Sequence, residues 1–342
     1  MSAVITAEGL TMRFRRPVKR PGLAGSLKHL VHPEYTWATA VADVNLSIEP
    51  GESVAYVGPN GAGKSTTIKL LCGILIPSAG RVEVCGLQPH RNRQRNAANI
   101  SVVFGQRTQL WWDIPVIESL RLLGDIYSVP ATEYQRNLTE MVDVLDLAPL
   151  LPVPVRQLSL GQRMRCDLAA ALIHSPRVLF LDEPTIGLDV AVKAKLRELV
   201  GRMVRERGLT LMLTSHDVGD IEQLCPRLVM LDAGRVVYDG RYAELSRRFA
   251  WETKITASSA VPLDGHPELA VAQIPGVTRT DRPDGTTLRV WFDNRVATCG
   301  TVVAGIVDQF RISDLAVDEG AAEDVIRRLY SGDLEYSTEE PA

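Results

Sequence analysis

The sequence of 342 residues has few of the features that mark membrane-spanning or disulfide-stabilised proteins. It has no apolar run close to the roughly 18–20 residues that a helix needs to cross a bilayer. If the protein works at a membrane, another chain is therefore expected to supply the spans. Its five cysteines are scattered and form no Cys-x-x-Cys pair. Neither a zinc site nor a disulfide framework is indicated, and reduced thiols in a cytosolic compartment are expected.

The chain also lacks a strong charge of either sign and an N-terminal signal pattern. Its net charge is −3 and its isoelectric point is about 6.1, which argues against bulk binding of nucleic acid. There is no internal repeat and no low-complexity segment. The length suffices for one large α/β domain and an accessory domain of roughly 100 residues.

The most informative string is Gly58-Pro59-Asn60-Gly61-Ala62-Gly63-Lys64-Ser65, which we call the phosphate loop. It has the form G-x-x-x-x-G-K-[ST] and lies between an apolar, β-prone run at 52–57 and a helical run at 66–72, as this motif requires. Glycines allow backbone N–H groups to turn toward phosphate oxygens, Lys64 adds a charge between the outer phosphates, and Ser65 offers a hydroxyl to Mg²⁺. The predicted nucleotide-binding residues are Gly58, Pro59, Asn60, Gly61, Ala62, Gly63, Lys64, Ser65 and Thr66.

Two adjacent carboxylates, Asp182 and Glu183, close the apolar strand predicted at 177–182. Charges at the end of a buried strand cost free energy unless they are paired or bound to metal. Beside a phosphate loop, Asp182 is predicted to hold Mg²⁺ through its water shell, and Glu183 to polarise the attacking water.

Four further strings occur in the order typical of one family. Leu158-Ser159-Leu160-Gly161-Gln162 resembles the signature Leu-Ser-Gly-Gly-Gln, and Asp182-Glu183-Pro184-Thr185 follows it. Gly187-Leu188-Asp189 and Thr214-Ser215-His216-Asp217 come next, and Gln106 lies where this family places a lid glutamine. Over residues 1 to about 245 the chain resembles the nucleotide-binding subunit of ABC transporters.

The resemblance implies roles for individual residues. Gln106 and Ser65 would approach Mg²⁺, Glu183 would act as general base, and His216 would contact the γ-phosphate. The signature residues Ser159, Gly161 and Gln162 would bind ATP held by the opposite subunit of a homodimer, and Asp189 would communicate across that interface. ATP and Mg²⁺ are thus the expected ligands.

Two features depart from the family pattern. Leu160 replaces the usual signature glycine, which restricts the backbone but leaves its N–H available. A basic insertion at about 15–32 separates the first strand from the phosphate loop, so the aromatic residue that stacks on adenine is not fixed. Phe14 is the first choice, with Tyr35 and Trp37 as alternatives, and core packing is an equal interpretation for all three. Within the insertion, Leu23, Leu27, Leu30 and Val31 favour a short amphipathic helix, with a solvated loop as the equal alternative.

The string from Val103 to Pro115, with the basic insertion, resembles the ATP-binding subunits of ABC-2-type exporters, including the group named after viologen export. Trp111 and Trp112 follow the lid glutamine, where this family docks the coupling helices of its permease. We expect both rings to be partly buried against that membrane partner, the alternative being packing within the helical subdomain. The subunit is then expected at the cytoplasmic face of the membrane, as a peripheral protein.

The predicted fold class is α/β: a P-loop NTPase core with an antiparallel β subdomain, a helical insertion at about 107–170, and a small C-terminal α+β domain. The domains are predicted at 1–245 and 246–342. Strands are expected at 4–14, 40–49, 52–57, 81–84, 100–104, 177–182, 210–214, 228–231 and 235–238. Helices are expected at 66–72, 117–147 with a break at Pro130, 159–174, 190–207 and 321–330.

The predicted function is ATP hydrolysis by a pair of subunits that drives a separate permease, with no nucleic-acid partner. The resemblance to ABC-2-type exporters implies that this permease exports its substrate. The alternative is an ATPase of the same type that works in translation or DNA repair without a permease. Translation factors carry two such cassettes and repair ATPases carry long coiled coils, and neither pattern is present here. A GTPase would need an Asn-Lys-x-Asp string, which is absent.

Overall fold

The computed structural model describes residues 3–17, 35–105, 107–249 and 252–318. It divides into two compact units, residues 1–240 and 241–342, which are described separately. The helices predicted within 15–32 and at 321–330, and the lid residue Gln106, lie outside the described residues. Within those ranges, no helix combines the length and the apolar character that crossing a bilayer requires.

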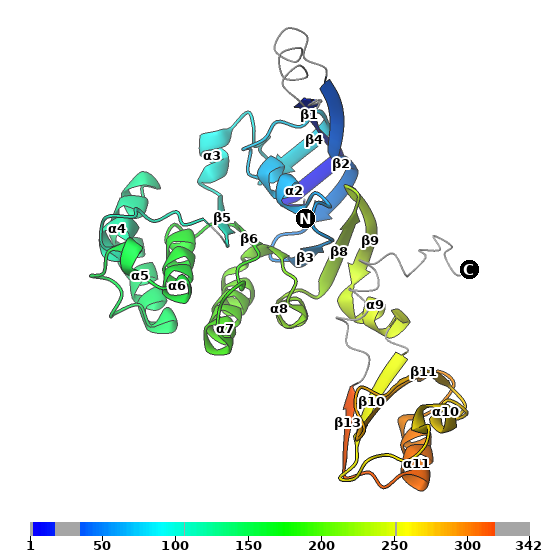
Figure 1. Ribbon diagram of the computed structural model, residues 1–342. Coiled ribbons are helices and arrows are strands. Elements are labelled where there is room, and N and C mark those ends of the chain that lie inside the picture. The colour runs from blue at the N-terminus through cyan, green and yellow to red at the C-terminus, as the bar shows by residue number, and fades with distance from the viewer. Residues whose placement is uncertain (1–2, 18–34, 106, 250–251, 319–342) are drawn as a thin grey trace, which may run out of the picture. The chain divides into compact units, whose positions relative to one another are not determined.

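The first unit is built around a sheet with the strand order β5-β6-β7-β3-β8-β9 in the described chain (Figure 1). Its first five strands run parallel. The bounds are β3 Ser53–Val57, β5 Ile100–Phe104, β6 Val178–Asp182, β7 Thr210–Thr214, β8 Arg227–Asp232 and β9 Arg235–Arg241. All residues of β3 and β7 are buried, and apart from Ser53, Thr210 and Thr214 they are apolar, as expected for parallel strands covered on both faces. The phosphate loop, Asp182 and Thr214 therefore meet at the carboxyl ends of neighbouring strands.

Helices flank this sheet: α2 Lys64–Leu71, α3 Arg93–Ala97, α7 Val190–Arg207 and α8 Val218–Leu224. A second group, α4 Val116–Ile126, α5 Ala131–Leu145 and α6 Leu160–Leu172 with the 3₁₀ turn η1 Val155–Gln157, forms the predicted helical insertion beside β5 (Figure 1). Pro130 separates α4 from α5 because its ring fits the start of a helix but not its interior. The break predicted at this residue is confirmed.

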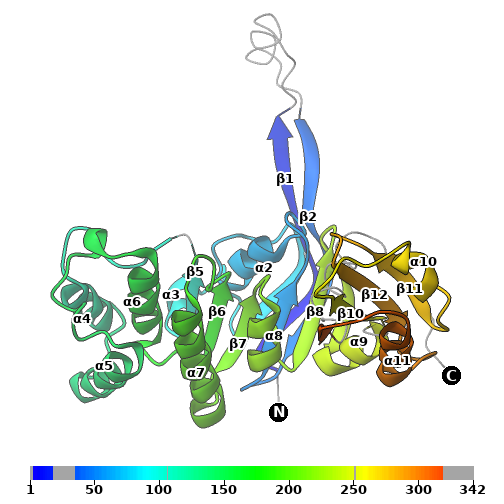
Figure 2. The same ribbon diagram turned by 60° about the horizontal axis from the view of Figure 1, so that its bottom comes forward.

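An antiparallel sheet of order β2-β1-β4 completes the first unit, with β1 Ile5–Pro17, β2 Tyr35–Ile48 and β4 Ala79–Val84. Figure 2 shows β1 and β2 extending from the rest of this unit as a two-stranded ribbon. The predicted bounds of these two strands were wrong: β1 continues past Phe14 to Pro17, and β2 begins at Tyr35, before Ala40. The added Arg and Thr residues, Arg15, Arg16, Thr36 and Thr39, are exposed, so the composition resembles a loop although the strands pair in register.

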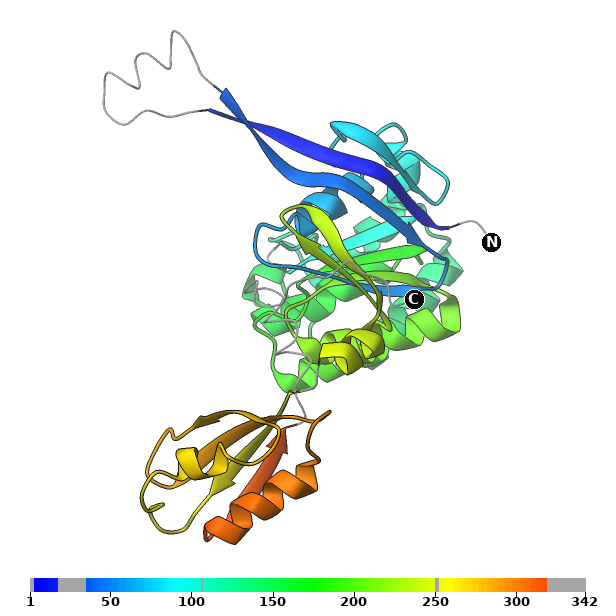
Figure 3. The same cartoon turned by 90° about the vertical axis from the view of Figure 1, so that its right-hand side faces the viewer.

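The second unit contains α9 Tyr242–Phe249, followed by a βαββαβ sequence of elements: β10 Glu252–Ser258, α10 Pro267–Val271, β11 Val277–Asp281, β12 Thr287–Asp293, α11 Cys299–Gln309 and β13 Asp314–Asp318. The sheet order β11-β12-β10-β13 gives a split βαβ, or ferredoxin-like, topology in the described residues. Helices α10 and α11 lie on one face of this sheet (Figure 3), where Ile255, Val290 and Phe292 are buried with Val302 and Ile306. The predicted α+β class of this region is confirmed.

Candidate nucleotide-binding site

The phosphate loop is held by backbone groups of two neighbouring segments. A Cβ on Gly58 would lie 2.3 Å from the Leu231 carbonyl oxygen, and one on Gly63 would lie 2.3 Å from the Ala40 carbonyl oxygen. Gly63 also has φ +105°, a region that side-chain-bearing residues rarely occupy. These glycines are therefore required by space and, at Gly63, by backbone conformation.

Lys64 is 9% exposed and bends back over the loop, where its ammonium donates to the carbonyl oxygens of Gly58 at 2.5 Å and Pro59 at 3.3 Å. Burial lowers its pKa, while the carboxylates of Glu183 and Asp182 oppose that shift. A buried ammonium with neutral carbonyl partners is well suited to exchange them for charged phosphate oxygens.

Asp182 and Glu183 are oriented by Thr214 at the end of the neighbouring strand. The Thr214 hydroxyl donates to Asp182 Oδ1 at 2.7 Å, and the Glu183 N–H donates to the Thr214 carbonyl oxygen at 3.0 Å and its hydroxyl at 3.1 Å. Glu183 has φ +55°, so its backbone is held in a strained conformation of the kind common at functional sites. Sequence reasoning assigned no separate role to Thr214, although a polar residue ending an apolar strand was the available signal.

His216 faces Glu183 across the gap between the loops that follow β7 and β6. The ring Nε2 of His216 lies 3.1 Å from Glu183 Oε1, and the backbone N–H of His216 donates to Glu183 Oε2 at 3.2 Å. Burial raises the pKa of the Glu183 carboxyl, and the nearby His216 and Lys64 oppose the rise. The structure thus brings the predicted base and the predicted switch histidine into direct contact.

A pocket of about 310 Å³ joins these groups, lined by Ser65, Lys69, Phe104, Gly105, Arg107, Asp182, Glu183 and Ile186. The Ser65 hydroxyl and the Asp182 carboxylate therefore share one cavity. Hydroxyl and carboxylate oxygens are the ligands that Mg²⁺ prefers, together with water and phosphate. No cluster of three or more His, Cys, Asp or Glu side chains suited to a metal occurs in the described residues. The donor set fits an ion that is held largely by substrate and water.

The signature string forms the start of α6. The Ser159 hydroxyl accepts from the Gln162 N–H at 3.3 Å, and the Gln162 side chain accepts from the Ser159 N–H at 2.9 Å, which is a complete capping box. Ser159, Gly161 and Gln162 thus define an exposed helix N-terminus in the helical insertion. None of the three lines the pocket that contains Ser65 and Glu183.

Leu160, the departure from the signature, packs toward the Gly187-Leu188-Asp189 loop. Its Cδ2 would lie 2.7 Å from a Cβ on Gly187. Asp189 caps α7, because its carboxylate accepts from the Val192 N–H at 2.9 Å. The substitution therefore adds a contact between two of the family strings and leaves the helix start intact.

The three candidate adenine-stacking residues lie on the β1–β2 ribbon. Phe14 is half-buried and pairs with Ala38, two residues from Ala40, whose carbonyl oxygen approaches Gly63. Trp37 is 68% exposed, and the Tyr35 ring is covered by the Arg15 guanidinium at 3.5 Å. Phe14 is the least exposed of the three and stays the predicted stacking residue.

Trp111 and Trp112 leave 40% and 50% of their surface uncovered. The Arg163 guanidinium lies 5.7 Å from the Trp112 ring centre. The segment before them is anchored to α6 by the buried Asp167, which accepts from the Thr108 hydroxyl at 2.7 Å and the Gln109 N–H at 3.1 Å. Asp167 was not anticipated from the sequence, since one acid within a helix carries no local signal.

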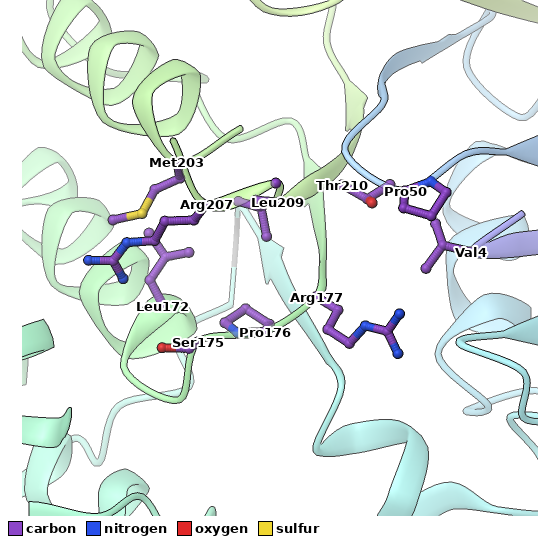
Figure 4. Close-up of a pocket in the computed structure, with 11 residues that line it drawn as sticks. Val4, Pro50, Leu172, Ser175, Pro176, Arg177, Met203, Arg207, Leu209 and Thr210 are labelled. Atoms are coloured by element: carbon purple, nitrogen blue, oxygen red, sulfur yellow. The ribbon is translucent and has the colours of Figure 1, made fainter. Parts of the chain in front are cut away.

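A second pocket, of about 270 Å³, is lined by residues near the amino ends of the strands, including Val4, Pro50, Pro176, Arg177 and Thr210 (Figure 4). The phosphate loop follows the carboxyl end of β3, so this pocket lies at the opposite edge of the sheet. It therefore plays no part in the site described above.

Comparisons with known proteins bear on the family to which the chain belongs. The family profile described as ABC transporter matches residues 41–186. A "Nod factor export ATP-binding protein I" from Ralstonia nicotianae is 33% identical over 240 residues, covering 68% of this chain and 73% of the relative. The chain belongs to the ATP-binding proteins of the ABC transporter family.

Other relatives extend this result. The "ABC transporter ATP-binding protein NatA" of Bacillus subtilis is 32% identical over 206 residues, covering 60% of this chain and 83% of the relative. The ATP-binding cassette MJ0796, solved as a dimer in a post-hydrolysis state with ADP and Pi, shares the fold with a TM-score of 0.58 and 24% identity, covering 69% of this chain and 98% of that one. The predicted ATP-binding, ATP-hydrolysing transport subunit is confirmed, and these relatives give no support to a role in translation or repair.

Proposed function

We propose that this ABC ATPase acts as a homodimer with two ATP molecules sandwiched between its subunits, and that it powers export through a separately encoded membrane permease. The observation that carries the proposal is the separation of functional groups within one chain. Lys64, Ser65, Asp182, Glu183 and His216 gather around the phosphate loop, whereas the Ser159 capping box is exposed at a helix N-terminus of the insertion. A second subunit can bring that N-terminus to the γ-phosphate.

Within each site, Lys64 and the loop N–H groups bind the phosphates, and Phe14 stacks on adenine. Ser65, Asp182 and Gln106 would hold Mg²⁺, which would supply positive charge to neutralise the phosphates. Glu183 accepts a proton from the attacking water, and its burial and strained backbone support this role. His216, in contact with Glu183, donates toward the γ-phosphate oxygens as their charge increases.

Export and a permease partner are supported by the relatives and by exposed surface. The Ralstonia relative is named for Nod factor export. Trp111 and Trp112 are exposed next to the lid segment, and large aromatic surface of this kind is typical of interaction sites. Arg13, Arg15 and Arg16 are exposed on the β1–β2 ribbon and support contact with the permease or anionic lipid. The subunit would then work peripherally at the cytoplasmic face of the membrane.

The substitution Glu183→Gln tests the catalytic part of this proposal. The amide keeps the shape of the side chain but cannot accept the proton of water, and loss of a general base costs about 10²–10⁴-fold in turnover. ATP binding is expected to persist, so the variant accumulates an ATP-bound dimer, detected by size-exclusion chromatography with ATP and Mg²⁺.

The matched control is Glu206→Gln, which removes an exposed carboxylate from α7 and is expected to leave turnover unchanged. Near-normal hydrolysis by Glu183→Gln would remove this residue from the role of base. A monomer that persists under trapping conditions would contradict the nucleotide sandwich.

A further inference from the structure

Asp220, on α8, is fully buried and accepts three hydrogen bonds from side chains. The Thr185 and Ser215 hydroxyls donate to Oδ2 at 2.6 and 2.8 Å, and the Arg197 Nε donates to Oδ1 at 2.6 Å. A buried carboxylate is expensive unless its partners are fully arranged around it. Here two hydroxyls and one guanidinium provide that arrangement.

The three donors come from three different elements, and two of them adjoin the catalytic pair. Thr185 lies two residues after Glu183, in the segment that follows β6. Ser215 is the residue before His216, in the segment that follows β7. Arg197 lies in the middle of α7. One carboxylate thus joins the backbone segments that carry the predicted base and the predicted switch histidine.

Arg197 contacts the histidine segment a second time, because its terminal nitrogen donates to Asp217 Oδ1 at 3.1 Å. Lys193 donates to the other Asp217 oxygen at 2.6 Å, and the Asp217 N–H donates to the Ser215 hydroxyl at 3.0 Å. Asp217 is therefore fixed directly to α7, and Ser215 is fixed to Asp220 on α8, which is itself paired with Arg197 of α7. A planar guanidinium can contact both carboxylates at once, which a lysine cannot do.

We propose that Arg197 and Asp220 are positioning residues for ATP hydrolysis, which hold the Glu183 and His216 segments at the separation that their contact requires. The inference rests on the proposed roles of Glu183 and His216. The network does not line the pocket beside the phosphate loop, so it acts through these two residues rather than on the nucleotide. A displacement of about 1 Å at reacting groups costs about 10²-fold in rate, so a loosened network lowers kcat and spares ATP affinity.

The test measures kcat, KM and nucleotide affinity for full-length Asp220→Asn and Arg197→Lys. The expected result for Asp220→Asn is a kcat that is about 10–100-fold lower, with KM and affinity changed less than about threefold. Arg197→Lys keeps the positive charge but cannot contact both carboxylates at once. Its kcat is therefore expected to lie between those of wild type and Asp220→Asn. The matched control is Asp239→Asn, which breaks a bidentate ion pair with Arg227 in the same unit and leaves kcat unchanged.

A double-mutant cycle distinguishes positioning from a general loss of structure. In a His216→Ala background, Asp220→Asn is expected to lower the single-turnover rate less than about twofold, because the contact between the His216 and Glu183 side chains that the network maintains is already lost. Equal fold losses in both backgrounds would overturn the proposal. Unchanged kcat in a folded Asp220→Asn variant would overturn it as well.

Asp220→Asn can fail to fold, because it leaves Arg197 without its buried partner. Thr185→Val then tests the proposal, because it keeps the side-chain shape and the Arg197–Asp220 ion pair and removes one hydrogen-bond donor to Asp220. Its kcat is expected to be about threefold to tenfold lower than that of wild type. Wild-type kcat in Thr185→Val would overturn the proposal in that case. Glu183→Gln is measured in parallel. Normal turnover in this variant contradicts the proposed role of Glu183 as base. If Glu183→Gln is inactive but Thr185→Val and Asp220→Asn have wild-type kcat, only the positioning network is contradicted.

Discussion

Replacing Asp167 by Asn is expected to stabilise the protein at neutral pH, although its two hydrogen bonds are then accepted by a neutral amide oxygen instead of an ionised carboxylate. Asp167 is 4% exposed, and burial raises the pKa of its carboxyl from 3.8 to about 6, against the opposing effect of the Thr108 and Gln109 donors. Asn keeps an oxygen that can accept from both donors and has no charge to desolvate. The substitution therefore imitates the protonated acid.

The magnitude follows from the shift in pKa. A difference of about two pKa units at 1.36 kcal/mol each corresponds to about 3 kcal/mol of destabilisation when the folded protein carries the ionised Asp167. The folded pKa is raised, so the stabilising effect of protonation is fully present below pH 3.8 and is lost as the pH rises through about 6. Asp167→Asn should gain up to about 2–3 kcal/mol over wild type above pH 7, and this gain should vanish toward pH 4.

The assay compares the free energies of unfolding of the two full-length proteins, from thermal unfolding at about 5 pH values between roughly 4 and 8. Asp113→Asn is the control, because it removes an exposed carboxylate paired with Arg156 and should change stability by less than about 1 kcal/mol at every pH. A destabilised Asp167→Asn at neutral pH, or a difference from wild type that does not change between pH 5 and 8, would refute the reasoning.

Two further predictions concern the membrane partner. Trp112→Ala should weaken binding to the permease, measured by copurification, by at least about 2 kcal/mol, or about 30-fold in affinity. The ATPase activity of the isolated subunit should stay within about twofold of wild type. Unchanged copurification would indicate instead that Trp112 packs within the helical subdomain. Replacing Arg13, Arg15 and Arg16 by Glu should weaken binding to anionic vesicles in moderate salt by about 1 kcal/mol for each basic group lost. ATP hydrolysis should be unchanged. Equal vesicle binding by the variant and the wild type would contradict contact between the β1–β2 ribbon and the membrane.

The parallel core was predictable because buried parallel strands are apolar throughout, so composition alone identifies them. The predicted bounds 100–104, 190–207 and 210–214 coincide with β5, α7 and β7. The outer parts of β1 and β2 were not predictable, because their exposed Arg and Thr residues lack the alternation of a half-buried strand. The βαββαβ order of the second unit was also beyond the sequence, since pairing of β10 with β13 depends on contacts between distant residues.

The site divides in a similar way. Contiguous strings pointed to Ser65, Asp182 and Glu183, which line one pocket in the structure, because each string follows a strand of the same parallel sheet. Their roles in binding and catalysis stay predictions. Thr214 belongs to the histidine string but received no role of its own from it, and Asp167 and the Arg197–Asp220 pair were not identified by any string. Their partners are brought close only by folding, and a buried acid within an ordinary helix cannot be recognised from its neighbours in the chain.

The nucleotide sandwich is the central claim, and complementation between two inactive subunits tests it most directly. Lys64→Ala removes phosphate binding, and Ser159→Arg blocks closure of the capping box over the partner's γ-phosphate. Each variant should be inactive alone, while the exchanged mixture should regain ATPase activity, because one site of the heterodimer then combines wild-type Lys64 and Glu183 with a wild-type Ser159 from the other chain. Absence of rescue in a heterodimer whose formation is shown independently would contradict the shared site.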